Sequence, residues 1–185
     1  MSTSRKPKLA TLWLDGCSGC HMSLLDIDER ILALAAQIEV VCSPYVDIKE
    51  FPPDIDVAIV EGAVSSEEDL HKIRELRRCS KMLVALGDCA ITGNVPSMRN
   101  WFPIEDLMTR AYVDTATERL PPGDLPYPSR YVPALRNRVS PVHEVVTVDL
   151  FVPGCPPPAD AIHFVLTEIL AGRTPDVSQV TRFGK

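Results

Sequence analysis

The sequence has 185 residues, of which 45% are hydrophobic and 6% aromatic, so it is long and apolar enough to bury a core of its own. Its formal net charge of −6 disfavours nucleic-acid binding, because contacts to phosphate need a basic surface. No apolar run could cross a bilayer, and the polar start before Leu9 has neither a twin-arginine pair nor the apolar region of a secretory signal. We therefore expect one domain over residues 1–185, in the cytoplasm and without a transmembrane segment.

The first half of the chain alternates strand and helix patterns. A nearly continuous apolar run predicts a buried strand at 9–14. Apolar residues at helical spacing then predict one amphipathic helix over 24–35. Further strands are expected at 39–42, 57–60 and 81–86. A helix should start at Ser65-Ser66-Glu67-Glu68, where a hydroxyl can cap it, and end near Arg78.

The alternation breaks over about 95–142, which holds eight of the 17 prolines. One helix is expected there, near 104–111. The arginines of this segment outnumber its acids: Arg99, Arg110, Arg119, Arg130, Arg136 and Arg138. Because long irregular insertions are usually functional, we interpret it as an ordered surface that docks on another subunit; a solvated loop is the alternative.

A strand at 145–152 and a helix at 159–171 restore the pattern, and the tail from Arg173 is expected to be frayed or docked on a partner. Strands alternating with helices predict βαβ units with right-handed crossovers. The predicted fold class is α/β, a flavodoxin-like parallel sheet with helices on both faces and a long Pro-rich insertion.

Cysteines follow three of the predicted strands. Cys17 and Cys20 come after the first strand, Cys89 after the fourth and Cys155 after the fifth. In an open parallel sheet, ligands bind beyond the carboxyl ends of the strands, so these four thiols should meet at one edge. Cysteines in a cytoplasmic protein are more often metal ligands or core residues than disulfides. Cys42 and Cys79, in a strand and near a helix end, are expected to be structural.

Zinc and an iron–sulfur cluster both accept four sulfur ligands. Zinc sites usually pair two close Cys-x-x-Cys turns, whereas here one pair is joined by two distant single cysteines. A cluster is wider than one ion and accommodates ligands from distant loops, so we favour a cluster. A zinc site, and a redox-active Cys-x-x-Cys with unrelated further thiols, are the alternatives.

The motifs together resemble the small subunit of nickel–iron hydrogenases, over residues 12–172. They are Cys17-Ser18-Gly19-Cys20-His21, Glu61-Gly62, Gly87-Asp88-Cys89-Ala90 and Pro153-Gly154-Cys155-Pro156-Pro157. The resemblance implies that four residues hold the proximal [4Fe-4S] cluster: Cys17, Cys20, Cys89 and Cys155. His21, Gly87 and Gly154 would line its surroundings. It also implies that nickel and iron sit in a partner large subunit, where hydrogen is cleaved, so no catalytic residue is expected in this chain.

The subtype is narrowed by the lack of a twin-arginine leader and of a C-terminal region with further cysteines. This form looks like the small subunit of cytoplasmic bidirectional hydrogenases, which couple to NAD(P) through diaphorase subunits that contain FMN and iron–sulfur clusters. The related complex I quinone-reductase subunit has adjacent cysteines at the first motif, which disagrees with the spacing of Cys17 and Cys20. A complex I-like subunit and a zinc-stabilised interaction module remain as alternatives.

Three further residues carry expectations. Glu61, at a strand end, should face the cluster or the partner and influence proton or electron movement; a solvated acid is the alternative. His21 should hydrogen-bond a cluster sulfur or the partner, unless it is a plain surface histidine. Trp13 is interpreted as core. A flavodoxin-like sheet can also hold FMN, but Cys17-Ser18-Gly19-Cys20 occupies the usual phosphate loop, so FMN in this chain is a minor expectation.

Overall fold

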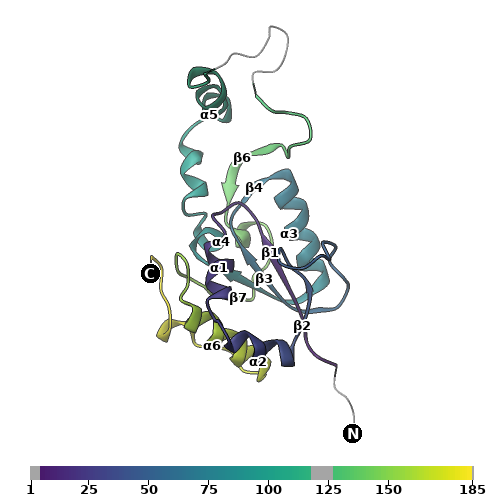
Figure 1. The fold of residues 1–185 in the computed structure, drawn as a ribbon. Helices are drawn as coiled ribbons and strands as arrows, with labels where there is room; N and C mark the ends of the chain where they lie inside the picture. The colour runs from purple at the N-terminus through teal and green to yellow at the C-terminus, as the bar shows by residue number, and fades with distance from the viewer. Residues whose placement is uncertain (1–4, 118–126, 185) are drawn as a thin grey trace.

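The protein, seen in a computed structural model that describes residues 5–117 and 127–184, is organised around a five-stranded sheet (Figure 1). Its strands are β1 (Lys8–Trp13), β2 (Glu39–Cys42), β3 (Ile55–Glu61), β5 (Ser80–Leu86) and β7 (Leu150–Val152). All neighbouring pairs are parallel, in the order β2-β1-β3-β5-β7. The chain therefore has the α/β, flavodoxin-like fold that the sequence predicts, with the strand order reversing between β1 and β3.

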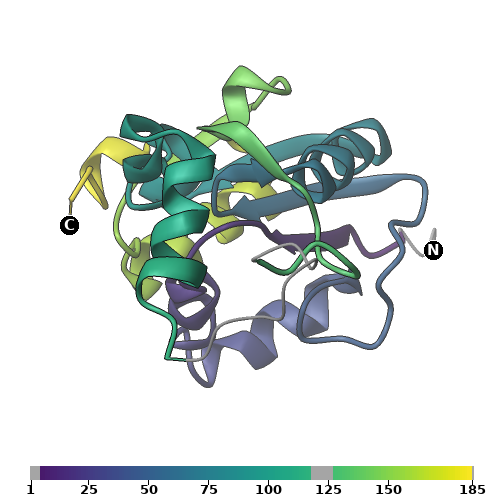
Figure 2. The same ribbon diagram turned by 90° about the horizontal axis from the view of Figure 1, so that it is seen from above.

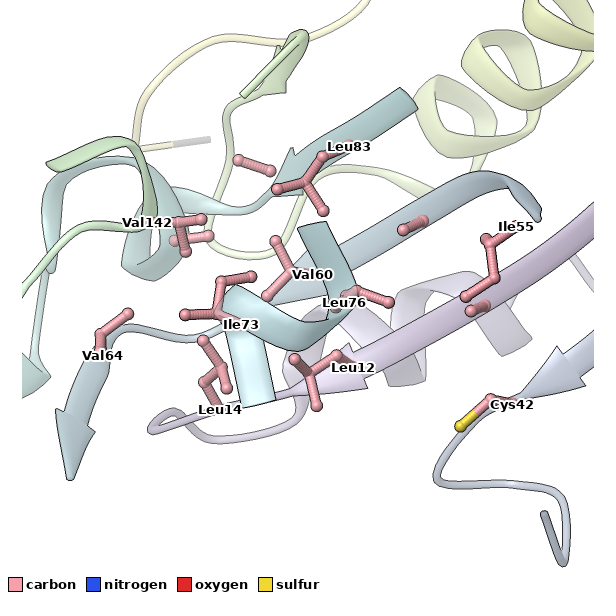
Figure 3. Close-up of a cluster of buried hydrophobic side chains, with 14 of the residues drawn as sticks. Leu12, Leu14, Cys42, Ile55, Val60, Val64, Ile73, Leu76, Leu83 and Val142 are labelled. Carbon is pink, nitrogen blue, oxygen red and sulfur yellow. The ribbon is translucent and has the colours of Figure 1, made fainter. Parts of the chain in front are cut away.

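Helices cover both faces of the sheet. On one face, α3 (Glu67–Cys79) and α4 (Asp88–Thr92) pack on a cluster of buried side chains; Figure 3 shows Ile73 and Leu76 of α3 among these. The other face packs against α1 (Gly19–Leu25), α2 (Arg30–Gln37) and α6 (Ala159–Leu170). Figure 2 shows α3 on the opposite side of the sheet from α1 and α2. Alternate strand residues serve opposite faces, which explains the nearly continuous apolar runs.

A second, two-stranded antiparallel sheet joins β4 (Val64–Ser66) to β6 (Leu135–Ser140). The end of the predicted insertion is therefore a strand, and the expectation of an irregular segment is wrong there. Only Val139 and Ser140 of β6 are buried. Because most of the strand is not buried on either face, its sequence lacks the alternation of apolar and polar residues that predicts a strand. Ser66, the last residue of β4, also caps α3 in a capping box with Asp69, as expected of that helix start.

The segment between α4 and β6 leads away from the sheet, and we call its described residues, 95–117 and 127–134, the arm (Figure 1). It contains a 3-10 turn at Pro96–Trp101, helix α5 (Ile104–Thr109) and a π turn at Arg110–Asp114, and none of the three has a buried residue. The helix expected near 104–111 is thus confirmed. Arg119 and the prolines at 121, 122 and 126 lie outside the described residues.

Three local predictions are wrong. The single helix expected over 24–35 is broken into α1 and α2, because Asp28 adopts a left-handed conformation with φ 62°. The strand expected over 145–152 is confined to β7, while the valines before it pack on the core without pairing. Trp13 is 47% exposed and not a core residue. Among the described residues, no helix combines the length and apolar character needed to cross a membrane.

Candidate metal centre

The four predicted ligands follow the carboxyl ends of β1, β5 and β7. Cys17 and Cys20 lie at the turn into α1, Cys89 lies in α4 directly after β5, and Cys155 follows β7. All four are free thiols; Cys17 and Cys155 are exposed, and Cys20 and Cys89 are half-buried. Cys42 is buried in the core and Cys79 packs against it, in agreement with structural roles.

The thiols influence one another electrostatically. Burial raises the pKa of Cys20, and the charges of Glu61, Cys89 and Cys17 raise it further. Burial and then the charges of Cys155 and Cys17 raise the pKa of Cys89 to about 11. Cys89 therefore lies within Coulombic range of the other three thiols. A bound metal group would supply the positive charge that favours the thiolate form of Cys20 and Cys89.

The donor set fits a cluster better than a single ion. Within residues 5–117 and 127–184, no three His, Cys, Asp or Glu side chains are close enough to hold one metal ion. A zinc ion needs all its sulfur ligands at about 2.3 Å from one point. In a cubane cluster each thiolate binds a different iron, so the thiols stand farther apart. Four cysteines supplied by three strand ends suit a cluster in number and in chemistry.

Gly87 leaves space for one of the thiols. A Cβ atom placed on Gly87 would lie 2.2 Å from the sulfur of Cys20, and the residue has φ +85°. The Gly87 N–H also donates to the Val152 carbonyl at 2.8 Å, which links the ends of β5 and β7. Only glycine meets both the steric and the conformational requirement.

Gly154 is held by Asp88, a buried residue that stands in the Gly87-Asp88-Cys89-Ala90 motif but was given no role there. Oδ1 of Asp88 accepts a hydrogen bond from the Gly154 N–H at 2.7 Å, and the Asp88 N–H donates to the Gly154 carbonyl at 2.8 Å. A second overlooked residue is Asn94, whose amide donates to the sulfur of Cys155 at 3.5 Å. An acid beside a cysteine at the end of an apolar strand is a signal that could have identified Asp88.

Glu61 and His21 form a buried pair, each 2% exposed, so the solvated-acid and surface-histidine alternatives are wrong. Oε2 of Glu61 accepts the His21 backbone N–H at 2.9 Å, and the Glu61 carboxylate contributes to the raised pKa of Cys20. Oε1 lies 3.0 Å from Nδ1 of His21, but the atoms are not aligned and neither has a hydrogen-bond partner among the described residues. The His21 ring is therefore directed at Glu61 and not at a subunit surface.

The opposite nitrogen of His21 extends this network away from the thiols. Nε2 lies 2.9 Å from the Thr11 hydroxyl, which donates to Ser43 at 2.8 Å. Both hydroxyls border a cavity of about 370 Å³ beside the ends of β1 and β2. Its walls carry the acids Glu50 and Glu75 and the bases Lys49, His71 and Lys72, and the FMN expectation stays a prediction.

This fold and its strand-end thiols define a class, a flavodoxin-like domain with a thiol-lined centre at the carboxyl edge of its sheet. Residues 17–169 match the profile of the family described as NADH ubiquinone oxidoreductase, 20 Kd subunit, and the chain belongs to this family.

Within the family, the chain is similar to hydrogenase subunits. It is 41% identical, over 96% of its length and 86% of the relative's, to the NAD-reducing hydrogenase HoxS subunit delta of Cupriavidus necator. It is 38% identical to a subunit of the F420-non-reducing hydrogenase vhu of Methanococcus voltae, over 93% of this chain but only 59% of that one. The chain thus spans little more than half of some relatives.

Solved structures agree with these relatives. A chain of an NAD+-reducing [NiFe]-hydrogenase, crystallised in the H2-reduced state, superposes with a TM-score of 0.88 at 41% identity, covering 97% of this chain and 99% of the other. A [NiFeSe]-hydrogenase chain of Dm. baculatum superposes with a TM-score of 0.59 at 19% identity, over 91% of this chain and 63% of that one, and shows the shared fold alone.

Proposed function

We propose that the chain is the electron-transfer small subunit of a cytoplasmic, NAD(P)-linked [NiFe] hydrogenase. It would hold the proximal [4Fe-4S] cluster through Cys17, Cys20, Cys89 and Cys155. The observation that carries the proposal is the position of these four cysteines after the carboxyl ends of β1, β5 and β7, at one edge of the sheet. The similarity to a subunit of an NAD-reducing hydrogenase supports it.

When bound, the cluster supplies one-electron transfer between a nickel–iron centre in a large subunit and a diaphorase module with FMN and iron–sulfur clusters. The residues of this chain hold the cluster and limit movement. Cysteines at rigid strand ends keep their places when the charge of the cluster changes, and buried groups such as Glu61 restrict water on the protein side. The exposed Cys17 and Cys155 leave the other side open to a partner.

The arm supports the proposed docking on another subunit. The 3-10 turn, α5 and the π turn contain no buried residue, and exposed apolar side chains gathered on one segment are typical of a surface that a partner covers. Trp101 is 85% exposed, and Val95, Met98 and Phe102 are exposed beside it. The arm begins next to Asn94, which contacts Cys155, so one partner can cover both the arm and the thiols. We assign that partner to the large subunit.

A complex I-like quinone-reductase subunit is the second candidate, because the family description names that enzyme. The Cys17-x-x-Cys20 spacing and the hydrogenase relatives favour the first candidate. Hydrogen-dependent reduction of NAD(P) by the purified complex would support the hydrogenase, and quinone reduction without hydrogen uptake would support the alternative.

The test of the cluster is the content of iron, acid-labile sulfide and zinc in anaerobically purified protein. About four iron and four sulfide per chain are expected. Cys155→Ser should lose this content, whereas Cys79→Ser, which changes a core-packed thiol, should keep it. Zinc near one per chain without sulfide, or full iron content in Cys155→Ser, would contradict the ligand assignment.

A further inference from the structure

Asp88 joins the loops that carry the two single cysteines. It precedes Cys89 in the chain, and it binds Gly154, which precedes Cys155, through both its carboxylate and its backbone N–H. These bonds, at 2.7 and 2.8 Å, run between the start of α4 and the loop after β7. Because Asp88 is buried, water does not compete for them. Cys89 and Cys155 are therefore kept at one relative position.

The other carboxylate oxygen of Asp88 binds a distant part of the chain, the segment 177–184. Oδ2 accepts a hydrogen bond from the Gly184 N–H at 2.9 Å. Thr181 is buried, and its hydroxyl donates to the Pro153 carbonyl at 2.5 Å, two residues before Cys155. Val177 packs against the same core cluster as α6. The expectation that this tail is frayed is thus wrong for residues 177–184, which lie on the ligand loops of their own chain, whereas its docking on a partner stays a prediction.

We propose that Asp88, secured by the segment 177–184, is the positioning residue that sets the separation of Cys89 and Cys155 and thereby the shape of the cluster site. The proposal rests on the proposed function, since it concerns two of the assigned ligands. The backbone N–H groups that Asp88 accepts come from separate loops, and in the described residues no other acceptor is bonded to either of them. The Asp88 side chain is thus the acceptor that the two loops share.

Asp88→Asn is the sharpest variant, because it keeps the size of the side chain but replaces one acceptor oxygen by an N–H2 donor. One of the two backbone N–H groups then faces a donor. We expect iron release to a chelator to become about tenfold faster, as the loss of one charge-assisted hydrogen bond implies. The reduced cluster should also show a broadened EPR spectrum and a shifted midpoint potential.

Thr181→Val tests the segment 177–184 without touching Asp88. It removes the hydroxyl that binds Pro153, and iron release should become about fivefold faster, as expected for a neutral hydrogen bond. The matched controls are Asp160→Asn, an exposed acid paired with Arg30, and Thr167→Val, whose hydroxyl donates to the His163 carbonyl on α6. Both controls should keep wild-type release rates, spectra and potentials.

The experiment compares these four variants with the wild-type chain in the intact complex, and melting curves and circular dichroism confirm that each is folded. One outcome is that Asp88→Asn lowers the melting temperature and leaves iron release, the EPR spectrum and the potential unchanged. That result would show that Asp88 only stabilises the fold, and it would overturn the proposal. If Asp88→Asn cannot be recovered folded, the same readouts on Thr181→Val decide. A wild-type chain without iron and sulfide would instead refute the proposed function itself.

Discussion

Replacing Gly87 by alanine should expel the cluster while leaving the fold in place. The new Cβ would lie 2.2 Å from the sulfur of Cys20, whereas ordinary contacts begin at about 3.5 Å, so the sulfur would have to move by roughly 1 Å. Metal–ligand distances tolerate only about 0.2 Å. The displacement therefore exceeds what a bound iron can accept, and Cys20 should be lost as a ligand.

The same substitution has a cost in stability. Gly87 combines φ 85° with ψ 159°, a region essentially restricted to glycine, where another residue costs on the order of 1–3 kcal/mol. Overpacking against the sulfur adds about 1–3 kcal/mol. We expect the free energy of unfolding of the metal-free chain to fall by about 2–6 kcal/mol in a urea titration, which is less than the upper part of the range of about 5–15 kcal/mol found for native domains, so the chain should still fold.

Gly172→Ala is the matched control, because Gly172 has φ +72° but no atom within 4 Å of its Cβ position. It should cost only the left-handed conformation, about 1 kcal/mol, and keep full iron and sulfide content. Iron, sulfide and the EPR spectrum of the reduced protein are the measurements for both variants. A Gly87→Ala chain that is folded and carries wild-type iron with an unchanged spectrum would refute the steric argument.

Two other predictions concern stability and docking. Burial raises the pKa of Asp56, but hydrogen bonds from Lys81, the Lys8 N–H and Arg5 lower it overall to about 2. Because the folded pKa is lowered, this stabilisation is complete above the unfolded value of about 3.9 and is lost as the pH falls towards the folded pKa. Asp56→Asn should flatten that part of the acid unfolding curve; a curve as steep as that of the wild type would argue against it. Trp101→Ser should leave the free energy of unfolding within about 0.5 kcal/mol but weaken large-subunit binding by about tenfold or more in titration. Leu32→Ser, exposed on α2, is its control, and equal affinity of the two variants would exclude Trp101 from the interface.

Most of the fold could be predicted because each apolar run or helical repeat lies within a single strand or helix and predicts that element by itself. The strand at 39–42 and the helix capped by Ser66 are reproduced by β2 and α3. The break between α1 and α2 could not be read in this way, since Ile27 continues the apolar repeat while Asp28 turns the backbone. Strand β6 was missed because its partner β4 is distant in sequence and its own side chains are mostly exposed.

Part of the candidate centre could likewise be predicted from the sequence, and part depends on contacts between distant residues. The positions of the four cysteines after β1, β5 and β7 follow from topology, because parallel strands end at the same edge. The burial of Glu61 and His21 depends on which side chains face inward after the Cys17–Cys20 turn. The spacing of apolar residues in the sequence does not predict this. The role of Asp88 depends on contacts with Gly154 and Gly184, which are 66 and 96 residues away in the chain. Such contacts become visible only in three dimensions.

The strand order gives a further reason to expect a cluster at this edge. β1, β3, β5 and β7 are successive neighbours, and β3 contributes Glu61 between the cysteines that follow β1 and β5. Neighbouring strands are about 4.8 Å apart, so the outer two of these four are separated by roughly 14 Å. The turns after the strands must close that span on whatever they bind. A group several ångströms wide needs a smaller closure than a single ion. Iron and sulfide in equal amounts are therefore what this sheet edge predicts.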